Sequence, residues 1–409
     1  MTNIRRTRLA GGLDLLTCAR RAAPVAAVTL WYRVGSRDEG AGSTGLAHFL
    51  EHMMFKGSGD MGKGAIDRLT QRSGGSNNAF TCCDATAYHF ELPAAHVGIA
   101  LRIEADRMRG LLLDGAELEA ERAVILEEIA QAEDEPEARV QTAVDRLLFG
   151  DHGYGHPVLG WRADIESCTV EGMRAFYDRW YGPGSAALVV AGDIDEGQVI
   201  ASAEALFPSG GGAGDRDLTA PGPLGAERRA TLREDVVVPR VAVAFRAPDT
   251  LDPRADALDL LARILATGRS SRLFRRLVEA DRLLSQVRAS NNARACGGSF
   301  QIDGEGRPAA DPGRIEEALF DELGRVAASG VTPHEVRRAK NGVLSETLFR
   351  AETAATLAED IGDAVANSTL EEFLTYTDRI EAVTADEIQA ACEAFCRRAD
   401  AVAVWSVPK

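Results

Sequence analysis

The chain has 409 residues, 45% of them hydrophobic, which is enough for two domains that each bury a full core. Its formal net charge of −16 argues against a nucleic-acid-binding protein and favours basic over acidic peptides as ligands. The 7 cysteines are scattered without a C-x-x-C pair, which predicts reduced thiols in a cytoplasmic protein.

The N-terminal region predicts a hairpin. Residues 1–8 are basic, but residues 11–21 alternate in a hairpin-like pattern and lack the apolar core of a signal peptide. No segment approaches the roughly 20 consecutive apolar residues that a membrane-spanning helix requires. We therefore expect no membrane association and a cytoplasmic location, with a signal peptide already removed from the chain as the open alternative.

The most informative motif follows the first long predicted strand, residues 24–33, and a Gly-rich turn. It is the H-x-x-E-H string from His48 to His52, on an apolar segment that predicts a helix. Histidines at i and i+4 share one helix face and can bind one zinc ion, with Glu51 beside them as the candidate general base. The alternative is a core helix with hydrogen-bonded histidines, but burying three ionisable groups without a partner is costly.

A catalytic zinc needs a third protein ligand. Residues 116–132 predict a long helix on which Glu121 and Glu128, at i and i+7, share a face while Glu127 points elsewhere. A carboxylate from this helix would complete a His₂Glu set. Because the stretch is crowded with acidic residues, its composition leaves a solvated acidic face as an equal alternative.

A Gly/Pro-rich segment near the middle of the chain predicts two domains. Residues 208–226 read as a linker between an N-terminal domain, 1–207, and a C-terminal domain, 227–409. Strands alternate with long helices in both halves. This predicts an α+β fold in which each half is a mainly antiparallel sheet backed by helices on one face.

The second half repeats the strand–turn–helix layout of the first without its metal-binding residues. Aligning the two helices places Asp259, Ala262 and Arg263 opposite the residues of the H-x-x-E-H string. This is the pattern expected of a duplicated domain with one inactive copy.

Together these patterns resemble the M16 metallopeptidases over essentially the whole chain. The segments that carry the resemblance are HFLEH, GGSNNAFT with DATAY, ERAVILEEI, GHP and FYDRWYGP. The resemblance implies a two-domain layer fold that forms half of a clam-shell. It also implies a zinc endopeptidase or oligopeptidase that hydrolyses extended peptides in an enclosed chamber.

The same resemblance assigns roles to residues. It implies one Zn²⁺ per chain bound by His48, His52 and Glu128, a zinc-activated water with Glu51 as general base, and Glu121 as a carboxylate that orients the site. The substrate would pair with the edge strand, whose residues are Asn77, Asn78, Ala79, Phe80 and Thr81.

One element of the family pattern is missing. Single-chain relatives hold the substrate carbonyl with an Arg and a Tyr from the inactive half, and Val278 and Ser285 occupy those positions here. We therefore expect a heterodimer with a second M16-like chain that supplies the pair. A homodimer active alone and a non-catalytic structural subunit are the alternatives, and the complete set of zinc residues disfavours the latter.

Overall fold

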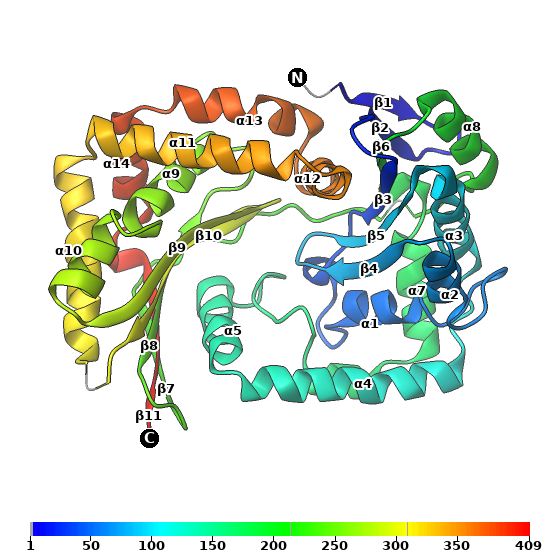
Figure 1. The fold of residues 1–409 in the computed structure, drawn as a ribbon. Helices are drawn as coiled ribbons and strands as arrows, with labels where there is room; N and C mark the ends of the chain where they lie inside the picture. Colours follow the sequence, from blue (N-terminus) through cyan, green and yellow to red (C-terminus); the bar gives the residue numbers. More distant parts are fainter. Residues whose placement is uncertain (1–2, 213, 309) are drawn as a thin grey trace. The chain divides into compact units, whose positions relative to one another are not determined.

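The computed structural model describes residues 3–212, 214–308 and 310–409; Met1, Thr2, Ala213 of the predicted linker, and Ala309 lie outside them. The chain forms two compact units, each an open sheet packed against helices, which confirms the predicted α+β fold (Figure 1). The first unit comprises residues 1–130, 156–217 and 348–373, and the second comprises 131–155, 218–347 and 374–409.

These units contain different stretches of the chain from the predicted domains. Their border at Asp217 and Leu218 falls inside the predicted linker, but each unit also takes a segment from the other half of the chain. The assignment of 1–207, 208–226 and 227–409 as sequence domains stays a prediction.

The first unit has a six-stranded sheet in the order β1-β2-β6-β3-β5-β4. All neighbouring strands are antiparallel except β2 and β6. The strands are β1 (Arg5–Arg8), β2 (Asp14–Ala19), β3 (Val25–Tyr32), β4 (Ser76–Thr81), β5 (Thr86–Pro93) and β6 (Ala186–Gly192). Strand β4 is at the edge of the sheet, as the resemblance to M16 peptidases implies.

One face of this sheet carries the main core and most helices. Val28, Leu30 and Tyr32 alternate along β3 and point into that core. The helices of the unit are α1 (Leu46–Met53), α2 (Ala65–Arg72), α3 (Val97–Gly110), α4 (Gly115–Asp134), α6 (Arg162–Ser167), α7 (Val170–Trp180), α8 (Glu196–Leu206) and α12 (Ala354–Asn367), with short 3₁₀ turns at Ser36–Asp38, Ala94–His96 and Pro183–Ser185.

Helix α12 covers the opposite face, so helices lie on both faces of the sheet and not on one face as predicted. Its Leu357 and Ile361 pack against Ala27 of β3 and residues of β2 and β6. A Cβ atom on Gly362 would lie 1.9 Å from Trp31 Nε1, so glycine is required for this close approach. Apolar residues on both faces explain why β3 reads as a nearly continuous apolar run.

The second unit has a five-stranded sheet in the order β7-β11-β8-β10-β9, with β7 and β11 parallel and the other pairs antiparallel. Its strands are β7 (Arg228–Glu234), β8 (Arg240–Ala247), β9 (Leu284–Arg294), β10 (Gly297–Gly306) and β11 (Ala401–Pro408). This order and these directions match β2-β6-β3-β5-β4 of the first unit, in agreement with the predicted repeat.

Helices flank this second sheet on both faces as well. The helices lying wholly or mainly in the unit are α5 (Pro136–Phe149), α9 (Arg254–Ala266), α10 (Pro312–Ser329), α11 (Pro333–Arg350), α13 (Leu370–Ala382) and α14 (Ala385–Phe395), with short helical segments at Phe274–Ala280 and Arg398–Asp400. Helix α5 contacts β7, β8 and β11. It is therefore the counterpart of α12. In each unit, one face of the sheet is covered by a helix from the other half of the chain.

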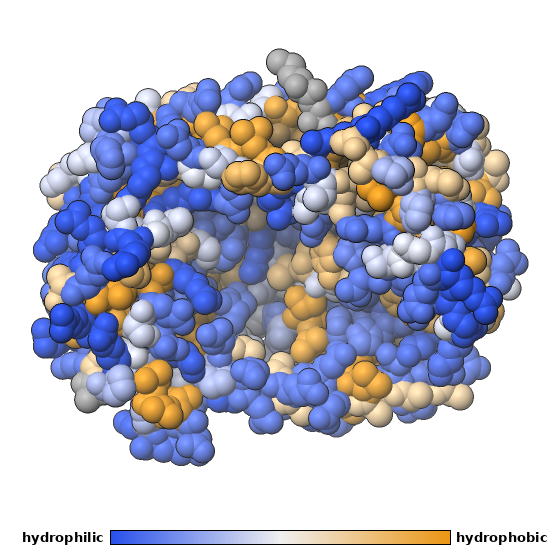
Figure 2. All heavy atoms as spheres, viewed as in Figure 1, coloured by the Kyte–Doolittle hydropathy of each residue, from blue (hydrophilic) through white to orange (hydrophobic). Residues whose placement is uncertain are grey.

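On the face drawn in Figure 2, hydrophilic side chains predominate and apolar side chains form separate patches. Among the helices that the structure describes, none has the length and apolar character to cross a membrane.

Candidate metal centre

Helix α1 directs its two histidines away from the core because its other side is apolar. Phe49, Leu50 and Met53 are buried in the core of the first unit. The side chains of His48 and His52 keep 13% and 17% of their surface exposed. The i, i+4 spacing therefore places both imidazoles on the accessible face, and their ring centroids are 4.6 Å apart.

A buried carboxylate caps the start of α1. Glu39 accepts hydrogen bonds from the backbone N–H groups of Gly45 at 2.6 Å and Ala47 at 2.7 Å. Among the described residues, no hydroxyl group caps this helix, since its N-cap residue is Gly45 and the neighbouring Thr44 donates its hydroxyl to Asp164 at 2.6 Å. Burial raises the pKa of Glu39, and the two N–H groups oppose that shift. This carboxylate fixes where the helix begins.

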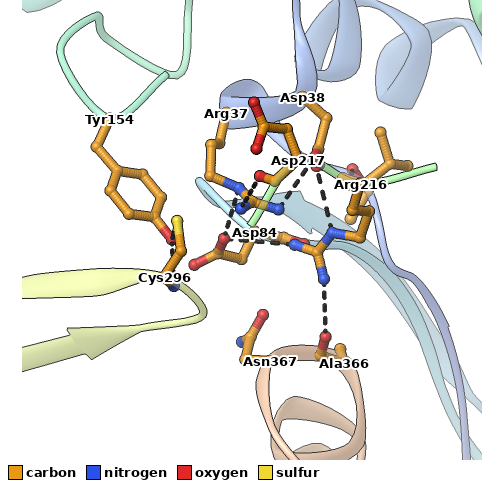
Figure 3. A network of polar contacts seen from close by, with 12 residues as sticks. Arg37, Asp38, Asp84, Tyr154, Arg216, Asp217, Cys296, Ala366 and Asn367 are labelled. Atoms are coloured by element: carbon orange, nitrogen blue, oxygen red, sulfur yellow. Dashed lines mark hydrogen bonds and ion pairs between the residues drawn. The ribbon is translucent and has the colours of Figure 1, made fainter. Parts of the chain in front are cut away.

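The loop before α1 is held by a buried network of ion pairs (Figure 3). The Arg37 guanidinium lies 3.0 Å from carboxylate oxygens of both Asp38 and Asp84. Arg216 approaches the same two carboxylates and donates to the carbonyl oxygen of Ala366 on α12. The network joins the loop, the β4–β5 turn and α12, so it restrains the segment that leads into the metal-binding helix.

Helix α4 brings the acidic residues to the same place. Leu118 and Ile125 are buried on it and turn Glu121 and Glu128 toward α1, whereas Glu127 is exposed. The predicted difference between these three glutamates therefore follows from the helical period.

His48, His52 and Glu128 converge. Glu128 Oε2 lies 3.7 Å from the Nε2 atoms of both histidines, and the three ligand atoms lie within 4.8 Å of one another. Two ligand atoms bound at about 2.1 Å to one tetrahedral ion are roughly 3.4 Å apart. Two imidazoles and a carboxylate at this spacing fit zinc. In the part of the chain that the structure describes, no other group of this kind occurs.

The protonation state of His48 suits a ligand. Burial, assisted by the nearby His52, lowers the pKa of His48 to about 4, so its imidazole is neutral at neutral pH. Its Nδ1 atom is buried without a hydrogen-bond partner among the described residues, while Nε2 faces Glu128.

His52 is oriented by a carboxylate that a lysine holds in turn. Glu121 Oε1 lies 2.9 Å from His52 Nδ1, and Glu121 Oε2 forms an ion pair with Lys56. Burial would raise the pKa of Glu121, but hydrogen bonds from Lys56 and His52 outweigh burial and lower it. A carboxylate of this kind fixes the ring and leaves Nε2 free to bind a metal. Lys56 lies one turn beyond His52, and the sequence alone does not indicate its contact with Glu121.

Glu51 lies beside this cluster but does not join it. The residue is 9% exposed, and its Oε2 accepts a 2.5 Å hydrogen bond from the Thr81 hydroxyl. Burial raises the pKa of Glu51, and the Thr81 hydrogen bond opposes that shift. The geometry thus separates Glu51 from the three converging residues.

The edge strand β4 runs past α1 and α2. Its residues Asn77, Ala79 and Thr81 face the helices: Asn77 donates to Asp67 of α2 at 3.1 Å, and Ala79 packs on the core. The remaining residues of the predicted substrate strand, Asn78 and Phe80, alternate to the other face.

The second unit has replaced the metal-binding residues with internal hydrogen bonds. Asp259, aligned with His48, accepts from Asn291 at 2.9 Å and from Tyr376 at 3.0 Å, and Arg263 pairs with Glu346. Burial raises the pKa of Asp259 to about 6. These contacts fix α9 within its own unit.

Two family models match this chain. The family model "Insulinase (Peptidase family M16)" matches residues 16–161, and "Peptidase M16 inactive domain" matches residues 167–343. An uncharacterized zinc protease of Streptomyces coelicolor is 30% identical over 406 residues, covering 95% of this chain and 86% of that protein. The chain belongs to peptidase family M16. The zinc protease PqqE of Helicobacter pylori is 25% identical over 375 residues, covering 90% of this M16 chain and 84% of PqqE.

Solved structures show the same fold. A protease from Helicobacter pylori superposes with a TM-score of 0.93 at 23% identity, covering 100% of both chains. The periplasmic protease PqqL from Escherichia coli superposes with a TM-score of 0.81 at 20% identity, covering 100% of this M16 chain and 48% of PqqL.

Proposed function

We propose that this protein is a zinc-dependent endopeptidase or oligopeptidase. The observation that carries the proposal is the convergence of His48, His52 and Glu128 beside a buried, separate Glu51. The proposed ligands are the three converging residues, and one Zn²⁺ would bind per chain. Relatives named zinc proteases support this assignment.

Each residue around the site would have a distinct task. Bound zinc would supply a Lewis acid that polarises a peptide carbonyl and lowers the pKa of a water molecule. Glu51 would accept the proton of that water at a carboxylate oxygen and deliver it to the nitrogen of the leaving amine. Glu121 would hold the ring of His52 in the orientation that presents Nε2.

The substrate would bind as an added strand along β4. An edge strand offers unpaired backbone N–H and C=O groups to an extended peptide. The side chains of Asn77 and Thr81 already form hydrogen bonds with α2 and α1. The backbone of residues 77–81 would therefore provide the main contacts with the substrate. Such contacts do not depend on substrate sequence, and selectivity would come from side-chain pockets and an enclosed chamber.

Substrate binding would be completed by a second M16-like chain. Val278 is buried and apolar, and the short Ser285 side chain is hydrogen-bonded to Glu305, so neither provides a free donor for a substrate carbonyl. Loss of an oxyanion donor typically lowers a rate by about 10²–10³-fold. PqqL, of which this chain matches 48%, is an M16-like fold about twice as long. We therefore propose a heterodimer whose partner provides the Arg and the Tyr.

The test is peptide turnover by the isolated zinc-loaded chain and by its mixture with an M16-like chain that has the Arg/Tyr pair. We expect slow cleavage of a fluorogenic peptide by the isolated chain, an increase of about 10²-fold or more in the mixture, and a heterodimer mass in solution. A homodimer as active as any mixture would contradict the split site. Absence of turnover in all mixtures would contradict the peptidase.

A further inference from the structure

The Glu51 carboxylate is tied to the edge strand by one hydroxyl group. Thr81 Oγ1 donates to Glu51 Oε2 at 2.5 Å. Within the described part of the chain, no other hydrogen bond to this carboxylate is formed. The two residues come from different elements, α1 and β4, which are separated in sequence by the whole of α2.

Thr81 is rigidly placed. It is the last residue of β4 and pairs with Thr86 of β5, so its backbone is fixed by the sheet. As a β-branched residue it has few χ1 rotamers, which limits the positions of its hydroxyl. Alternation along the strand directs this side chain toward α1, as it directs Asn77 toward Asp67 of α2.

From this geometry we infer that Thr81 is the positioning residue for Glu51. Through the Thr81 hydroxyl, the strand proposed to bind the substrate also orients the general base. The inference rests on the proposed peptidase function. A glutamate has three side-chain torsions, and a base works only when its carboxylate oxygen is within hydrogen-bond reach of the proton it takes. Holding Oε2 through Thr81 leaves Oε1 for the water molecule. A peptide paired with β4 would thus be positioned by the same end of the strand that positions the base.

A purely structural hydroxyl would behave differently. Thr86, directly opposite on β5, is fully buried and donates to the carbonyl oxygen of Val34 at 3.0 Å. Its replacement by valine removes a hydroxyl from the same strand pair without touching Glu51. Thr86→Val therefore serves as the matched control for Thr81→Val.

The experiment compares wild type, Thr81→Val, Thr81→Ser and Thr86→Val, each loaded with zinc and mixed with the partner chain. We expect Thr81→Val to lower kcat by about 10- to 100-fold, the effect of losing one hydrogen bond to a charged group, with KM changed by less than about 3-fold. Thr81→Ser should restore most of kcat. Zinc content should be the same in all four proteins because the Thr81 hydroxyl is hydrogen-bonded to Glu51, which is not among the proposed ligands.

Crystal structures of the metal-free variants provide a readout that needs no activity. The Glu51 carboxylate should occupy one position in wild type and Thr81→Ser, and several in Thr81→Val. Wild-type kcat in Thr81→Val, or an unmoved and equally ordered Glu51 carboxylate, would overturn the inference, and so would an equal loss of kcat in Thr86→Val. Failure of the peptidase proposal is distinct: wild type itself would show no turnover, and the structures would still decide the position of Glu51.

Discussion

Replacing Glu128 tests the proposed third zinc ligand. Zinc binds to complete four-ligand sites in small domains with a free energy of about 10–16 kcal/mol, or roughly 2.5–4 kcal/mol per ligand. Because Glu128 Oε2 is equally close to both imidazoles, at 3.7 Å, we assign it a full share. Glu128→Ala should therefore raise the Kd for zinc by about 10²–10³-fold, and Glu128→Gln by somewhat less because an amide oxygen remains.

The assay is competition for zinc against a chromophoric chelator, with elemental analysis of the purified proteins. Glu127→Gln is the matched control, since Glu127 is the exposed neighbour on the same helix and should bind zinc as wild type does. The Glu128 side chain is 35% exposed, so thermal unfolding of the metal-free protein should hardly change. Wild-type zinc affinity in Glu128→Ala would refute its assignment as a ligand.

Three further predictions follow from the same structure. Glu121→Gln should weaken zinc binding by about 10- to 100-fold, less than Glu128→Ala does, because it disturbs the orientation of His52 and removes no ligand; equal losses in a chelator competition would contradict this order. Cationic peptides should be cleaved faster than anionic peptides of equal length, and this preference should shrink as salt is added, given the net charge of −16; a preference independent of salt would indicate pocket contacts. A hydrogen bond from Arg272 is the largest of the interactions that lower the pKa of Glu335 from 4.5 to about 2. The ionised Glu335 should therefore stabilise the fold above pH 4.5, and this stabilisation should be lost as the pH falls toward 2. In Glu335→Gln the free energy of unfolding, followed by circular dichroism, should depend less on pH over this range.

The sequence was sufficient where the signal is local. The i, i+4 spacing of His48 and His52 and the i, i+7 spacing of Glu121 and Glu128 determine shared helix faces, and the structure places them as expected. The choice of Glu128 over a solvated acidic face needed the resemblance to M16 peptidases. Spacing within one helix carries no information about which second helix lies opposite.

Contacts between distant segments could not be predicted. The hydrogen bond between Thr81 and Glu51 depends on how strands and helices pack, and so does the bond between Glu39 and the start of α1. No sequence motif marks these residues. The exchange of α5 and α12 between units was missed for the same reason, because either helix could cover either sheet. The sequence does not predict strands β7 and β9 because their many polar and charged residues show no alternation of apolar positions.

Glu51→Gln tests the central claim most directly, because it preserves the shape of the side chain and removes only its capacity to accept a proton. The measurement is zinc content and peptide turnover on the same preparation, mixed with the partner chain and compared with wild type. We predict about one Zn²⁺ per chain in both proteins and a fall in turnover of about 10²-fold or more in the variant. Turnover close to that of wild type, with zinc bound, would contradict the assignment of Glu51 as the general base.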